Sequence, residues 1–387
     1  MRPDLAAVGL GLLLTEHIWH EFLVLGWPAL GVLDDGLLVF LLLAIMPRMT
    51  LPMLKALAPV LVFGLVNAIA LVGASDAFES ARLLLPYLVC CLVGVALRSD
   101  AIERVLRIWC WVGLLACLYS LASYCWFRFV NDCQRAPASG LIEQILTFPY
   151  STPVYPRGWR LAGTLLNDNY SAMLAAAQAL LLVKLLGRWR WAAILPIVCF
   201  LFGFSRSAWV GLALALLFLF ARRGWWVALV LLPLLFALSF QVGTYRDQYR
   251  FQHVMQTSGG RLQTLQRAGE SLVKAPWGRG AGRMGLADVQ FAKIAYETGW
   301  PGFLSFAAVI VAVLRAGLRA PRNSLKQFCT AAWLVILGGG VGADVLVVPQ
   351  VACLFWTLSG VILNPGLPSD PRAPELASTQ GPVSLLT

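Results

Sequence analysis

The chain has 387 residues, of which 59% are hydrophobic and 13% are Asp, Glu, Lys or Arg, and its formal net charge at pH 7 is +11. Soluble globular domains carry about 25% charged residues, so this composition excludes an ordinary soluble enzyme. Apolar runs of roughly 18 residues recur along the whole chain, which is the length that a helix needs to cross a membrane. The sequence therefore predicts an all-α, polytopic membrane protein.

Taken in chain order, the hydropathy pattern predicts twelve membrane-spanning helices. The first begins like the core of a signal peptide, but no small-residue cleavage site follows it, so we interpret it as a membrane helix. The predicted spans cover residues 5–25, 32–47, 53–72, 82–97, 101–127, 165–186, 190–204, 207–221, 224–240, 287–314, 326–347 and 349–364.

Two connecting segments are long: residues 128–165, and residues 241–286 between the ninth and tenth spans. We expect residues 1–364 to form a single transmembrane domain. Residues 365–387 are rich in Pro, Ser and Ala and are expected to be a disordered tail.

The distribution of Lys and Arg predicts the orientation. Short loops after even-numbered spans are basic, such as the loop with Arg188 and Arg190, whereas short loops after odd-numbered spans are mostly acidic or neutral, such as Asp34–Asp35. Because basic residues concentrate in short cytoplasmic loops, we expect both termini to be cytoplasmic and both long loops to lie on the outer side.

Many basic residues are nonetheless predicted at the outer side. Twelve of the fourteen are arginine, whose planar fork pairs with phosphate through two hydrogen bonds and stays charged when desolvated. Either they form a solvated surface facing anionic lipid, or they form a site for a polyanion. The set comprises Arg82, Arg128, Arg135, Arg157, Arg160, Arg206, Arg246, Arg250, Arg261, Arg267, Lys274, Arg279, Arg283 and Lys293.

Three stretches carry recognisable motifs. They are RGWRLAGTLLNDNY at residues 157–170, FSRSAWVG at 204–211, and residues 260–302, which contain GR, PWGRGAG and ETGWPG in that order. Together they resemble the O-antigen ligase and O-antigen polymerase superfamily of bacterial membrane proteins. Its members show R-L-x-G-T-x-x-N-x-N, an S-R turn, a large periplasmic loop with G-R and P-x-x-G-x-G, and then E-x-G-x-x-G. The resemblance covers about residues 157–305 and agrees with the predicted spans.

The resemblance implies a glycosyltransferase of the bacterial inner membrane with its active site facing the periplasm. The donor would be a glycan on undecaprenyl diphosphate, and the acceptor a hydroxyl of a glycan or a lipid-linked glycan. The reaction would invert the anomeric centre without a metal or a cofactor. Membrane lipid and a chain-length regulator protein are further expected partners, and no nucleic acid is expected.

By position, Arg160, Arg206 and Arg261 match the arginines of the family, which would stabilise the charge on the leaving diphosphate. We expect Arg206 to lie in a tight turn between the seventh and eighth spans and to face a cavity shared with the other two. Further substrate contacts are predicted for Arg157, Trp159, Asn167, Asn169, His253, Arg279 and Arg283.

The sequence differs from the ligases at residue 288. The ligases have histidine eleven residues before the glycine of E-x-G, which is Gly299 in this chain, whereas this chain has Asp288 there. Polymerases of O-antigen or exopolysaccharide more often have aspartate there, so we favour a polymerase and expect Asp288 to be catalytic, as a base or an orienting group. The alternatives are an O-antigen ligase that acts on lipid A-core, and a non-enzymatic transporter of the lipid-linked glycan.

No metal site is predicted. His17, His20 and Glu21 share one face of the first span, but no fourth ligand is evident. The sequence also lacks a P-loop and a dinucleotide fingerprint, so no nucleotide is expected to energise the reaction.

Overall fold

The structure is a computed structural model that describes residues 4–15, 33–74, 76–130, 146, 161, 168–203, 205–220, 249–284, 289–346 and 348–367. Throughout these residues the regular elements are helices and there is no strand, so the predicted all-α class is confirmed for the described part. The predicted tail after residue 367, most of the first long loop and the span at 224–240 lie outside the described residues.

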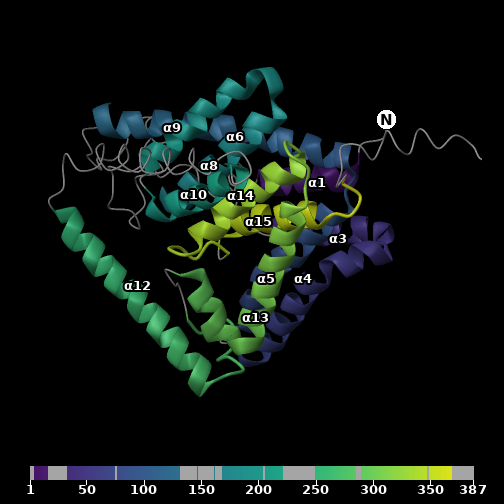
Figure 1. Cartoon of the computed structure of the whole chain (residues 1–387), viewed down its shortest axis with the longest axis vertical. Coiled ribbons are helices and arrows are strands. Elements are labelled where there is room, and N and C mark those ends of the chain that lie inside the picture. Colours follow the sequence, from purple (N-terminus) through teal and green to yellow (C-terminus); the bar gives the residue numbers. More distant parts are fainter. Residues whose placement is uncertain are drawn as a thin grey trace, which may run out of the picture.

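Twelve α-helices are described, and four of the connections between them contain a short 3-10 or π helix (Figure 1). The α-helices are α1 (Leu5–Leu14), α3 (Leu33–Ile45), α4 (Leu51–Ala70), α5 (Ala77–Ala96), α6 (Ser99–Cys125), α8 (Asp168–Leu185), α9 (Ile194–Gly203), α10 (Arg206–Phe220), α12 (Tyr249–Lys274), α13 (Gln290–Leu318), α14 (Leu325–Gly339) and α15 (Pro349–Leu363). The turns are η2 (Met46–Arg48), η3 (Leu71–Gly73), η4 (Trp126–Val130) and η5 (Gly187–Ala193).

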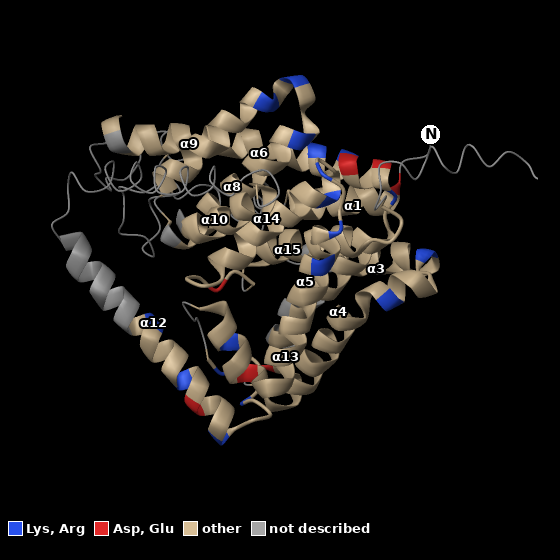
Figure 2. Cartoon of the chain, viewed as in Figure 1, with Lys and Arg blue, Asp and Glu red and all other residues tan. Residues whose placement is uncertain are grey.

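Three helical stretches are long and apolar enough to cross a membrane: Leu51–Gly73, Ser99–Cys125 and Gln290–Leu318. The other apolar helices have 10–17 residues. In Figure 2, Lys, Arg, Asp and Glu lie mostly at the edges of the bundle and along α12, and the helices between them are largely uncharged. This distribution is compatible with a membrane protein.

Two predicted spans differ in detail from the helices that form. The range 287–314 corresponds to α13, but Gly299 interrupts that helix with φ 64° and ψ −158°. The range 326–347 corresponds to α14, which ends at Gly339 and is followed by non-helical residues 340–346. Both changes occur at glycine, which gives up helical geometry more readily than other residues.

Glycines bring two pairs of helices into backbone contact. A β-carbon on Gly211 of α10 would lie 2.0 Å from the Val335 carbonyl oxygen of α14, and one on Gly360 of α15 would lie 2.1 Å from the Cys91 carbonyl oxygen of α5. Small residues allow such close approach, and van der Waals packing is a main source of helix association in membranes. An aromatic cluster of Phe63, Tyr87, Phe306 and Trp356 then joins α4, α5, α13 and α15.

Gly211→Ala should destabilise the protein by about 2 kcal/mol or more, because the added methyl group meets backbone atoms of α14 and the two helices must separate. Gly36→Ala in α3 is the matched control, since its added methyl group would meet nothing within 4 Å. Unfolding of both purified variants in detergent measures the difference. Equal stability of the two variants would contradict the described packing of α10 on α14.

Candidate functional site

Residues 340–346, which we call the 340–346 segment, leave helical geometry inside the bundle, and all of them except Val341 are buried. In a membrane protein, non-helical backbone needs protein partners for its polar groups. The Gln290 N–H donates to the Gly340 carbonyl (3.0 Å), and the Leu346 N–H donates to Gln290 Oε1 (2.8 Å). The Tyr87 hydroxyl donates to the Leu346 carbonyl (2.6 Å). Helices α5 and α13 therefore fix the two ends of the segment.

Arg261 of α12 reaches the middle of the same segment. Its Nη2 donates to the Gly342 carbonyl oxygen at 3.0 Å. A β-carbon on Gly342 would lie 3.4 Å from Arg261 Cζ and 3.0 Å from Ser207 Cβ, so the guanidinium and the start of α10 flank one glycine. The Arg261 Nε is buried and has no hydrogen-bond partner within the described part of the chain. The guanidinium therefore keeps a donor that an anion could use.

The start of α10 is the predicted serine–arginine turn. Arg206 is the first residue of the helix, and Ser205 caps it by accepting a hydrogen bond from the Ala208 N–H (3.2 Å). The backbone of Arg206 is described, whereas its side chain lies outside the described part. A helix N-terminus carries partial positive charge and suits phosphate groups.

The first motif stretch, residues 157–170, ends next to the 340–346 segment. The Tyr170 hydroxyl, in the first turn of α8, donates to the Asp344 carbonyl (3.2 Å). Leu161, the residue after Arg160, donates its N–H to the Phe202 carbonyl near the end of α9 (3.1 Å). Residues from all three motif stretches therefore lie next to the 340–346 segment or next to the serine–arginine turn.

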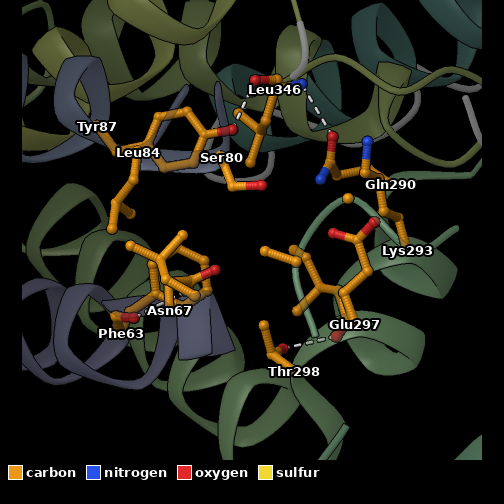
Figure 3. Close-up of a pocket in the computed structure, with 14 residues that line it drawn as sticks. Phe63, Asn67, Ser80, Leu84, Tyr87, Gln290, Lys293, Glu297, Thr298 and Leu346 are labelled. Carbon is orange, nitrogen blue, oxygen red and sulfur yellow. Dashed lines mark hydrogen bonds between the residues drawn. The ribbon is translucent and has the colours of Figure 1, made fainter. Parts of the chain in front are cut away.

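Lys293 and Asp344 form a buried ion pair two residues further along the segment. The Lys293 Nζ lies 3.0 Å from Asp344 Oδ2, and the two side chains are only 13% and 3% exposed. A cavity of about 80 Å³ lies beside this pair, between α4, α5 and α13 (Figure 3). Its polar lining comes from Asn67, Ser80, Tyr87, Gln290, Lys293 and Glu297.

The PWGRGAG and ETGWPG motifs pack against each other and have a structural role. Pro301 has no N–H, so the Glu297 carbonyl loses its usual helical partner and accepts instead from the Gly280 N–H (3.0 Å). The Trp300 N–H donates to the Pro276 carbonyl (2.9 Å). A β-carbon on Gly299 would lie 2.2 Å from the Pro276 carbonyl oxygen. The PWGRGAG loop therefore completes the hydrogen bonds of the broken helix, and glycine is required where the two backbones meet.

Arg279 and Arg283, predicted to bind substrate, lie with this loop. The Arg279 Nε donates to Ser271 Oγ (3.1 Å), and its guanidinium lies 5.4 Å from the centre of the Tyr296 ring. The Arg283 Nε donates to the Gly73 carbonyl (3.2 Å). Ser271 is ten residues after Arg261 on α12, which corresponds to roughly 15 Å along the helix axis. The structure therefore places the Arg279 guanidinium away from Arg261, at the other part of α12.

Several predicted site residues are described only in part or lie outside the described residues. Asn169 lies in the first turn of α8, half-buried, and His253 belongs to α12, with its side chain outside the described part. Arg157, Trp159, Arg160, Asn167 and Asp288 lie outside the described residues.

Sequence reasoning placed Lys293 among the basic residues of the outer side and Glu297 in the ETGWPG motif, but named neither as a catalytic or substrate-binding residue. The signal that could have found them is an ionisable side chain inside a predicted span, which is costly and often functional.

Within the described residues, no group of three or more His, Cys, Asp or Glu side chains could hold a metal ion.

Comparison of the chain with protein-family models finds no matching family, and comparison with curated proteins finds no match. The motifs themselves are therefore the basis of the family resemblance.

The buried ion pair can be tested by a double-mutant cycle. Lys293→Met should destabilise the protein by about 3–5 kcal/mol, because it leaves the Asp344 carboxylate buried without its cation. Adding Asp344→Asn should recover most of that loss, since no uncompensated charge remains. Unfolding of the single and double variants in detergent measures both effects. Additive losses in the double variant would argue against the pair.

Proposed function

We propose that the chain is a glycosyltransferase of the bacterial inner membrane that polymerises O-antigen or exopolysaccharide. It transfers a glycan from undecaprenyl diphosphate to a sugar hydroxyl at the periplasmic face, by an inverting reaction without a metal. Both termini are cytoplasmic in this proposal. The observation that carries it is the position of Arg261, whose guanidinium lies against Gly342 and next to the first turn of α10.

The proposed chemistry follows from these groups. A basic side chain takes the proton of the acceptor hydroxyl while the hydroxyl oxygen attacks the anomeric carbon. The bond from that carbon to the diphosphate oxygen breaks, and the electron pair stays on the diphosphate. Arg261 and the N-terminus of α10 supply fixed positive charge where this negative charge develops, which is the most effective use of charge in catalysis. Asp344 and Lys293 fix the segment on which Arg261 rests.

The main alternative is an O-antigen ligase, which differs in its acceptor, lipid A-core. Asp288 in place of the ligase histidine is the sequence observation that favours the polymerase. Supplying purified protein with lipid-linked repeat units alone, and then with lipid A-core as well, separates the two. A ladder of polymer without lipid A-core supports the polymerase. Movement of the lipid-linked glycan across vesicles without bond formation would indicate a transporter instead.

Arg261→Lys should lower turnover of lipid-linked repeat units by about 10²-fold or more, because an ammonium group cannot hold phosphate through two parallel hydrogen bonds. Arg267→Lys is the matched control, since Arg267 lies on the same helix and is exposed. A polymer-ladder assay with equal amounts of folded protein measures both. Full activity of Arg261→Lys would contradict the proposed role.

Treatment with a chelator should leave the activity of purified protein unchanged, because the proposed site holds the diphosphate with arginine and a helix N-terminus. The measurement is polymer formation before and after exhaustive treatment with EDTA. Loss of activity that magnesium or manganese restores would overturn the metal-independent reaction.

A further inference from the structure

The cavity beside the Lys293–Asp344 ion pair has the composition of a sugar site. Amide and hydroxyl groups of Asn67, Ser80, Tyr87 and Gln290 line it, together with the Lys293 ammonium group. Such groups donate and accept hydrogen bonds, as sugar hydroxyls require. Its volume is about 80 Å³, and since one water needs roughly 10–15 Å³, it can hold several waters that part of a sugar ring would displace.

Glu297 is the carboxylate of this cavity. Its side chain is 8% exposed, and Figure 3 shows the carboxylate directed into the cavity from α13. It accepts hydrogen bonds from the backbone N–H groups of Met284 (3.2 Å) and Gly282, which hold it in this orientation. A carboxylate offers about four acceptor positions on two oxygens, so these two bonds leave capacity for a hydroxyl proton.

Two contacts connect the cavity with the part of the 340–346 segment that Arg261 touches. Lys293 precedes Glu297 by one helical turn and pairs with Asp344. Asp344 is two residues after Gly342, whose carbonyl accepts from Arg261. The Arg261 guanidinium and the cavity that holds the Glu297 carboxylate are therefore both connected to one short buried segment, through Gly342 and Asp344.

We propose that this cavity receives the acceptor sugar and that Glu297 is the catalytic base. The acceptor hydroxyl gives its proton to the Glu297 carboxylate while its oxygen bonds to the donor's anomeric carbon, and the electron pair of the broken bond leaves with the diphosphate. This inference rests on the proposed glycosyl transfer. Asp288, selected from the sequence, is then left with the orienting role.

Glu297→Gln is the direct test, because glutamine keeps the shape and an oxygen that can accept from Met284, and loses only the basic carboxylate. Turnover of lipid-linked repeat units should fall by about 10²-fold or more. Binding of undecaprenyl diphosphate should be unchanged, since arginine supplies it. Glu270→Gln, an exposed carboxylate on α12, is the control and should retain full turnover. Turnover of Glu297→Gln within about threefold of the wild type, or equal losses of turnover and diphosphate binding, would overturn the proposal.

A second measurement on the wild-type protein does not require the variant to fold. A lipophilic carbodiimide should modify Glu297, and the repeat-unit oligosaccharide released from its lipid should slow that modification, as measured by mass spectrometry. Modification at an unchanged rate would overturn the inference. If the wild type forms no glycosidic bond at all, the proposed function fails. If the wild type is active and Glu297→Gln is equally active, only the inference about Glu297 fails.

Discussion

The hydrogen bond from the Arg261 guanidinium to the Gly342 carbonyl is the contact on which the proposed site depends. It exists because the chain unwinds after Gly339 inside the bundle and leaves backbone groups that neighbouring helices must satisfy. Helices α5, α8, α12 and α13 all contribute a partner to this stretch. A buried segment with several obligatory partners thereby gathers residues that are far apart in the sequence.

The need to satisfy buried backbone groups also explains the structure around the break in α13. In α13, Gly299 and Pro301 interrupt the helix, and the PWGRGAG loop supplies the hydrogen bonds that the helix lacks. This break turns the short first part of α13 so that Lys293 and Glu297 face the cavity beside the 340–346 segment. A motif that resembles a ligand-binding glycine loop thus has a structural role here, and it positions the polar residues of the cavity indirectly.

The hydropathy pattern located most of the described apolar helices, because long apolar runs have few alternatives to helix in a membrane. It did not predict α12, since residues 249–274 lie in the segment 241–286, which we expected to be a connecting loop and which is too polar to be recognised as a span. It predicted neither the break at Gly299 nor the end of α14 at Gly339, since hydropathy averages over a window and is insensitive to single glycines. Arg261 and Ser207 at the start of α10 both lie against Gly342. The predicted cavity shared by Arg160, Arg206 and Arg261 stays a prediction, because Arg160 and the Arg206 side chain lie outside the described part. Position in a motif could not separate Arg261 from Arg279, because their separation is set by the length of α12. The cavity depends on which helices pack together, and a single sequence carries little information about that.

The most direct test of the account is photo-crosslinking with an undecaprenyl diphosphate glycan that carries a photoreactive group close to the diphosphate. The labelled peptides are then identified by mass spectrometry, with and without excess unlabelled lipid. The account predicts saturable labelling at the start of α10, around Arg261 on α12 and in the 340–346 segment. Saturable labelling confined to other surfaces, such as the Arg279 end of α12, would contradict it.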